Sequence, residues 1–167
     1  MVSLLCTASA AAADRSHSKA RDDDVVFRPP FTLRVPVDRQ HYYEEKKGRT
    51  PYVYQGEVGL FIGDHFGLKI DVQDGTVRSV KYERDLGKAD VTLEFKQGDP
   101  VDGKATSLLI MQNRTKYTFL MDARMTVPDR KDILATSFDP VRAGILHAES
   151  WPHAIVQLGL RNIRVQK

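Results

Sequence analysis

Three residues near the C-terminal end of the chain could bind a metal ion. His147 and Glu149 are two positions apart, so on a β-strand their side chains point to the same face, and a loop could fold His153 back beside them. Imidazole and carboxylate groups are ligands of divalent metals. The spacing does not form an established motif such as H-E-x-x-H, and ordinary strand and loop residues are the competing interpretation.

Aromatic residues supply the other candidate contacts. Tyr42, Tyr43 and Tyr52 form a local concentration that could bind a protein or a glycan, or could cover one end of the core with their hydroxyls in water. Trp151, the only tryptophan, could stack on a sugar or on a partner side chain. Pro152 restricts Trp151 to extended conformations, and large aromatic side chains are usually buried. We therefore expect Trp151 to be structural first.

Composition argues against several functions. The chain has 25 basic and 22 acidic residues in interleaved order, so it lacks the one-sided positive field that nucleic acid requires. Catalytic serine motifs such as G-x-S-x-G are absent, as are the glycine patterns that bind phosphates or dinucleotides. We expect no cofactor and no nucleic-acid partner.

The N-terminal residues indicate export. Residues 1–13 are uncharged and end in Ala11-Ala12-Ala13, as at a signal-peptide cleavage site, which predicts a periplasmic or secreted protein. A lipoprotein anchored through Cys6, the only cysteine, is the alternative, although Leu5 precedes it where a small residue is typical. Residues 14–25 form a polar tail that we expect to be mobile, and residues 26–167 form one domain. No apolar stretch is long enough for a transmembrane helix.

Apolar and polar residues alternate in many short segments, which predicts an all-β protein. Outside the leader, no 11-residue window keeps a helical period. The fold expected is an antiparallel β-sandwich, immunoglobulin-like or similar, with about eight to ten short strands and little helix. The uneven connections favour a sandwich over a ligand-carrying barrel.

Four local predictions follow from the pattern. Ser107 to Thr126 reads as two strands of a central hairpin that meet at a turn near Asn113, with Phe119 and Met121 facing inward. Asp74-Gly75 predicts a two-residue hairpin turn with Val72 opposite Val77 and Asp71 opposite Arg78. A change of phase predicts a β-bulge near Arg161-Asn162. Residues 38–50 and 96–105 are expected to be loops.

The function expected from these observations is that of a non-enzymatic binding or structural module acting through its loops. Two alternatives stay open. One is a small exported hydrolase or metal-dependent enzyme that uses His147, Glu149 and His153. The other is a β-barrel carrier of a small apolar ligand.

Export is the first testable prediction. Mass spectrometry of the protein from its natural host should find a mature chain that starts near Asp14, because the small residues before it suit a signal peptidase. Recovery of an intact chain that still carries Met1 and Cys6 in the cytoplasm would contradict it.

Overall fold

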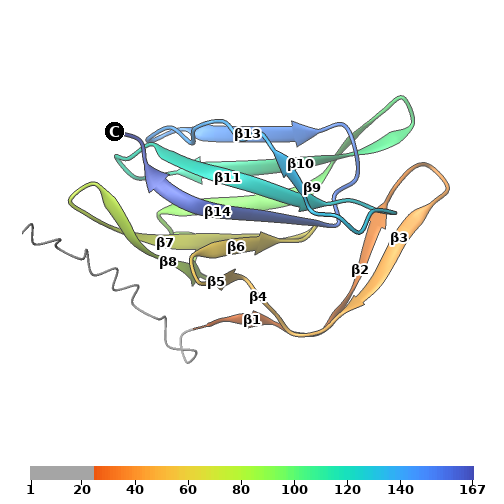
Figure 1. The fold of residues 1–167 in the computed structure, drawn as a ribbon, viewed down its shortest axis with the longest axis horizontal. Helices are drawn as coiled ribbons and strands as arrows, with labels where there is room; N and C mark the ends of the chain where they lie inside the picture. Colours follow the sequence, from red (N-terminus) through yellow and green to blue (C-terminus); the bar gives the residue numbers. More distant parts are fainter. Residues whose placement is uncertain (1–24) are drawn as a thin grey trace, which may run out of the picture.

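The computed structural model describes residues 25–167, and every regular element in this range is a β-strand (Figure 1). The 14 strands form two five-stranded antiparallel sheets and two two-stranded sheets. The large sheets pack face to face, which confirms the predicted sandwich. The predicted leader (1–13) and the predicted tail (14–25), except for Val25, lie outside the described residues.

The first large sheet has the strand order β13-β10-β9-β7-β8. Its strands are β7 (His65–Gln73), β8 (Thr76–Glu83), β9 (Val91–Val101), β10 (Lys104–Asn113) and β13 (Leu146–Trp151). Strands β9 and β10 form a long hairpin whose turn is Asp102-Gly103, both with positive φ. The expectation of a loop over residues 96–105 is therefore wrong for most of that range, because cross-strand pairing extends the two strands almost to the turn.

The second large sheet has the strand order β12-β11-β14-β6-β5. Its strands are β5 (Val53–Tyr54), β6 (Glu57–Leu60), β11 (Phe119–Thr126), β12 (Leu134–Thr136) and β14 (Gln157–Val165). The register between β11 and β14 shifts where Leu120 pairs with Arg164 and Asp122 pairs with Arg161. Asn162 has a φ of 52° inside this shift, which confirms the predicted bulge.

The core lies between the two large sheets and follows the period-2 pattern of the sequence. In β11, alternate residues from Phe119 to Met125 are buried, as predicted, and Phe119 is fully buried. The largest fully buried side chains come from both sheets, and Ile155 adds one from the β13–β14 connection: Phe66, Phe95, Phe119, Leu60, Leu68, Leu93, Leu109, Met111, Ile155, Leu158 and Leu160.

The turn at Asp74-Gly75 has the predicted position. Both residues have positive φ, and Val72 pairs with Val77. One residue further from the turn the register shifts, so Asp71 pairs with Ser79 and not with Arg78 as expected. A bulge in β8 causes this difference, and a pattern of alternating residue types does not reveal a single inserted residue so close to a turn.

The predicted central hairpin over residues 107–126 is wrong, because β10 and β11 belong to different sheets. The chain crosses between them after Asn113, whose side chain is fully buried. The Asn113 amide nitrogen lies 2.8 Å from the carbonyl oxygen of Tyr117 and 3.1 Å from those of Val141 and Arg142. Its side chain thus satisfies backbone acceptors at the crossing, and Asn113 does not have the left-handed backbone expected of a turn residue.

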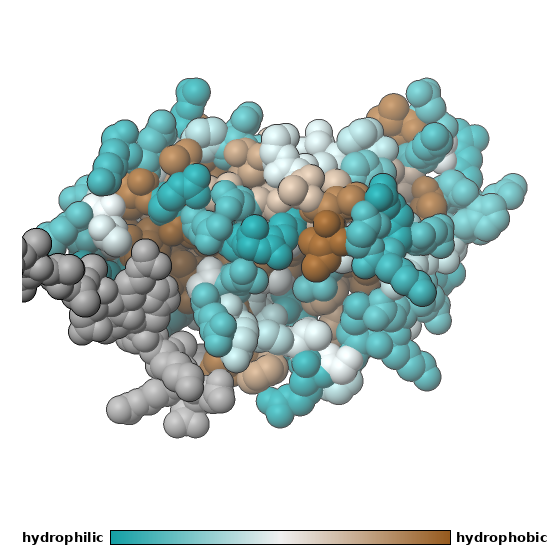
Figure 2. All heavy atoms as spheres, in the orientation of Figure 1, coloured by the Kyte–Doolittle hydropathy of each residue, from teal (hydrophilic) through white to brown (hydrophobic). Residues whose placement is uncertain are grey.

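A two-stranded arm extends from one end of the sandwich (Figure 1). It consists of β2 (Phe31–Pro36) and β3 (Tyr42–Lys47). The expectation of a loop over residues 38–50 is therefore wrong for residues 42–47, which form β3, whereas residues 38–41 form the turn before it. Figure 2 shows the arm as mainly hydrophilic on the face in view. Its inner side is apolar, since Leu33 and Val35 pack with Phe61, Ala105, Ala154 and Val156. Strand β3 was not predicted because its sequence is charged and shows no apolar alternation. A hairpin at the rim of the sandwich buries few residues, so it does not need apolar side chains at every second position.

Arg28 ties the start of the domain to the sandwich. It lies in β1 (Phe27–Arg28), which pairs with β4 (Thr50–Pro51). Its Nε and Nη2 atoms donate to the two carboxylate oxygens of Asp64 at 3.1 and 2.6 Å, and its guanidinium also donates to the carbonyls of Pro51 and Gly59. The guanidinium carbon lies 3.9 Å from the ring centre of Tyr52. All these contacts hold a buried charge in one orientation.

Truncation of the core provides a test of this packing. Phe119→Ala should lower the free energy of unfolding by about 3 to 5 kcal/mol, because it leaves a cavity between the sheets. Leu120→Ala, a neighbouring change on the other face of the same strand, should cost less because Leu120 is only half-buried. Denaturant unfolding of both variants checks this, and equal losses would contradict the inward face assigned to β11.

Candidate functional site

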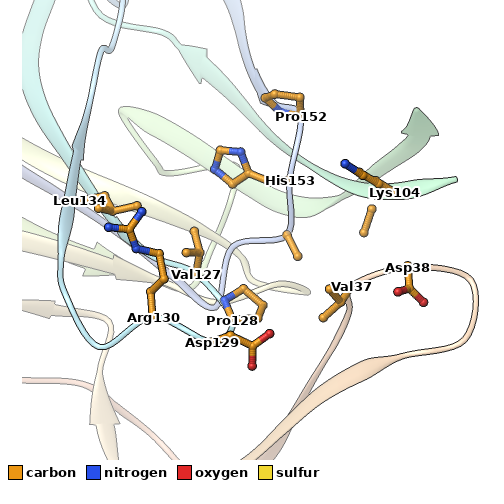
Figure 3. A pocket seen from close by; sticks show the side chains of 12 residues that line it. Val37, Asp38, Lys104, Val127, Pro128, Asp129, Arg130, Leu134, Pro152 and His153 are labelled. Carbon is orange, nitrogen blue, oxygen red and sulfur yellow. The ribbon is translucent and has the colours of Figure 1, made fainter. Parts of the chain in front are cut away.

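A pocket of about 440 Å³ lies where the arm meets the sandwich (Figure 3). Four connections line it: the turn of the arm, the β9–β10 hairpin, the β11–β12 connection and the β13–β14 connection. Its lining residues are Val37, Asp38, Lys104, Ala105, Val127, Pro128, Asp129, Arg130, Leu134, Pro152, His153 and Ala154. Segments that are far apart in the sequence therefore converge on one cavity.

Hydrogen bonds fix two sides of this pocket. The Ala105 amide donates to the carbonyl of Val37 at 3.1 Å, which joins the arm to β10. The buried Ser107 hydroxyl donates to the carbonyl of His153 at 3.1 Å and accepts from the Ile155 amide at 3.1 Å. The arm and the β13–β14 connection are thus both held by the first residues of β10.

The charged residues around the pocket fall into two groups. The Asp38 carboxylate accepts hydrogen bonds from the amides of Gln40 and His41, and these bonds lower the pKa of Asp38. Arg130 donates two hydrogen bonds to Asp132, at 3.0 and 2.7 Å. Both of these lining charges are engaged by neighbours along the chain.

Lys104 and Asp129 form the second group. Within residues 25–167, neither side chain makes a hydrogen bond or an ion pair. Asp129 has a φ of 63°, a left-handed conformation that aspartate tolerates better than most residues. The two side chains come from different connections and are both exposed, so a ligand in the pocket could reach a positive and a negative group.

The three predicted metal ligands are divided between two places. His147 and Glu149 share a face of β13, as expected, with 3.0 Å between His147 Nε2 and Glu149 Oε1. Glu149 also accepts from the Asp139 amide at 2.8 Å. His153 instead lines the pocket, with its Nε2 atom 3.4 Å from the sulfur of Met125. Across residues 25–167, no three His, Cys, Asp or Glu side chains gather closely enough to hold a metal ion.

The tyrosines do not form one cluster. Tyr42 is 52% exposed on β3, with the Arg34 guanidinium carbon 4.1 Å from its ring centre. Tyr43 points to the other face and donates its hydroxyl to Glu45, which raises the pKa of Tyr43. Tyr52 lies elsewhere, 4.4 Å from Tyr82 between ring centres. Of the three, Tyr43 packs on the apolar cluster between the arm and the sandwich, and none of them lines the pocket.

Trp151 is buried at the end of β13, as expected. Its Nε1 atom donates to the Thr136 hydroxyl at 3.0 Å, and its ring packs edge to face against Phe95 with 6.5 Å between centres. Trp151 therefore closes the core beside the pocket while its neighbours Pro152 and His153 line it.

Sequence reasoning missed most of the pocket. Of its lining residues, only His153 is a candidate from the sequence, as a metal ligand. A signal was present in the prolines of Val127-Pro128-Asp129 and Trp151-Pro152-His153, because two connections with a fixed backbone are suited to form rigid walls. Nothing in the sequence indicates that the two connections meet.

Replacement of Trp151 tests its structural role. Trp151→Ala should destabilise the protein by about 3 to 5 kcal/mol in denaturant unfolding, as expected for loss of a buried indole. Trp151→Phe should lose less because it keeps a ring against Phe95. The wild-type fluorescence should be blue-shifted and poorly quenched, and a strongly quenched indole whose removal leaves stability unchanged would contradict this role.

None of residues 25–167 lies in a helix with the length and apolar character needed to cross a bilayer. Comparisons with protein-family models, with curated proteins and with solved structures found no match for this chain.

Proposed function

We propose that this protein is a non-enzymatic binding module that holds a small ligand in the pocket between the arm and the sandwich. The observation that carries the proposal is the convergence of four connections on one cavity of about 440 Å³. Ligand sites in proteins usually occupy about 300 to 1,000 Å³ and combine apolar walls with a few polar groups. The proposal includes export, as the leader suggests, so that binding takes place outside the cytoplasm.

The lining favours a ligand with an apolar body and charges of both signs. Valine, proline, leucine and alanine side chains make up most of the wall, as in most small-molecule sites. Lys104 could pair with an anionic group of the ligand, and Asp129 could pair with a cationic group. A short peptide with an apolar side chain and free ends has this chemistry.

The alternative functions have less support. A metal-dependent enzyme based on His147, Glu149 and His153 would need the three side chains to converge, but His147 pairs with Glu149 while His153 contacts Met125. A carrier of an apolar ligand would need an enclosed apolar cavity, whereas this pocket lies at the surface and has charged residues around it.

Titration with leucyl-leucine tests the proposal on the full chain. NMR amide shifts should change at Ala105, Val127 and His153, and the ligand at 100 times its dissociation constant should raise the free energy of unfolding by about 2.7 kcal/mol. The acetylated and amidated dipeptide should bind less well because it lacks both charges. Decanoate, an apolar ligand, tests the alternative function of a carrier, which would bind decanoate more tightly than the dipeptide.

Charge reversals test the two polar contacts. Lys104→Glu and Asp129→Lys should each weaken binding of the dipeptide by about 0.2 to 1 kcal/mol, the usual worth of an exposed ion pair. Lys46→Glu, at an exposed lysine outside the lining that makes no ion pair within residues 25–167, serves as the matched control and should bind as the wild type does. Equal binding of the neutral derivative, or shifts confined to residues away from the pocket, would contradict the proposal.

A further inference from the structure

Strand β13 forms an open edge of the first large sheet. It pairs only with β10, and its register runs from Ser107 opposite Trp151 to Gln112 opposite Leu146 without a bulge (Figure 1). Natural proteins usually protect such edges with charged residues, prolines or bulges. The outward side chains of β13 include no charged residue and no proline, and its pairing with β10 has no bulge; its one carboxylate, Glu149, points inward.

The backbone of β13 presents free groups at this edge. The Asn113 amide donates to the carbonyl of Ile145 at 3.1 Å, so these two opposed residues form a hydrogen-bonded pair. Because such pairs alternate in antiparallel sheets, the N–H and C=O groups of Leu146, Ala148 and Ser150 point away from β10. Within residues 25–167, no backbone hydrogen bond reaches these three residues.

The side chains of the same three residues lie on the outer face of the sheet and are uncharged. All three are exposed, and Leu146 is 61% exposed. Ala148 pairs with Ile110 and Ser150 pairs with Leu108, so the uncharged surface continues onto β10. The opposite edge strand, β8, instead carries Arg78 and Lys81.

We propose that β13 pairs with β13 of a second copy of this chain, in antiparallel orientation with Ala148 on the two-fold axis. The two five-stranded sheets then continue as one sheet across the dimer. In this register Leu146 lies opposite Ser150 of the second copy, and the outward backbone groups of both strands bond to each other.

Charge complementarity selects this register. With Ala148 on the axis, each His147 lies opposite Glu149 of the second copy, beside the pair already formed within the chain at 3.0 Å. Sliding one strand by two residues in one direction places the two Glu149 side chains opposite each other. Sliding it in the other direction places the two His147 side chains opposite each other. Only the proposed register brings unlike groups together twice.

Residues of the same chain cover the inner face of β13, but they leave the outward N–H and C=O groups of the strand free to pair. Phe138 packs on His147 with 5.5 Å between ring centres, and the Asp139 amide bonds to Glu149. These contacts involve side chains of β13. Six residues per strand make a small interface compared with the 1,200 to 2,000 Å² that stable interfaces bury, so we expect a weak and reversible dimer.

Sedimentation of the full chain from about 5 to 500 µM tests the proposal across the affinity range of weak interfaces, with a reductant present because Cys6 could form a disulfide between copies. The wild type should move from monomer to dimer. Ala148→Lys should weaken dimerisation by at least about tenfold, because like charges would meet at the axis. Ala148→Pro should abolish dimerisation, because proline lacks the N–H that would bond to the second copy. The pairing of β13 with β10 should survive, since that N–H points away from β10. Thr76→Lys, a matched change on β8, should leave it unchanged.

Hydrogen exchange provides the second readout and distinguishes this edge from any other. The amides of Leu146, Ala148 and Ser150 should become protected as the wild-type concentration rises. If Ala148→Pro fails to fold, the Ala148→Lys variant decides the question. A chain that stays monomeric at the highest concentration, or a dimer unaffected by Ala148→Lys, would overturn the proposal.

Discussion

The ion pair between Arg28 and Asp64 fixes how the first strands join the sandwich. A buried charge is costly unless it is paired and fully hydrogen-bonded, and here Asp64 also accepts the Phe61 amide at 2.7 Å. The pair therefore fixes the turn after β6 and the position of β1 together. Because β2 begins at Phe31, three residues after Arg28, the root of the arm is set by the same contact. Removal of either charge would leave the other buried without a partner.

The pocket depends on this ion pair indirectly, because the arm forms one of its walls. Its walls on the sandwich side belong to short connections between strands, which Ser107 and the prolines hold in place. Its remaining wall is the arm, which reaches the sandwich through Leu33, Val35 and the amide of Ala105. A site of this kind combines a rigid side with a side joined by few contacts. Ligand entry and release would then involve the arm more than the sheets.

The alternation of residue types predicted the strands, the inward face of β11 and the bulge near Asn162, because burial on one face of a strand is written into the local sequence. Apart from the hairpin at Asp74-Gly75, it did not predict which strands pair. The crossing after Asn113 was mistaken for a hairpin because a buried amide that caps three carbonyls has the same residue type as a turn. Strand β3 was missed since both of its faces are charged. The pocket was missed because it arises from four connections whose meeting is a property of the topology.

Strand β14 occupies the centre of its sheet, between β11 and β6, yet the ribosome makes it after all the other strands described here. Its pairing with β6 joins residues that lie about a hundred positions apart in the sequence, from Leu60 to Leu158. The second sheet therefore cannot close until residues 157–165 have been made, because its middle strand is missing before that point. A polypeptide that crosses a membrane in the unfolded state, as the leader predicts, would have this delay built into its strand order.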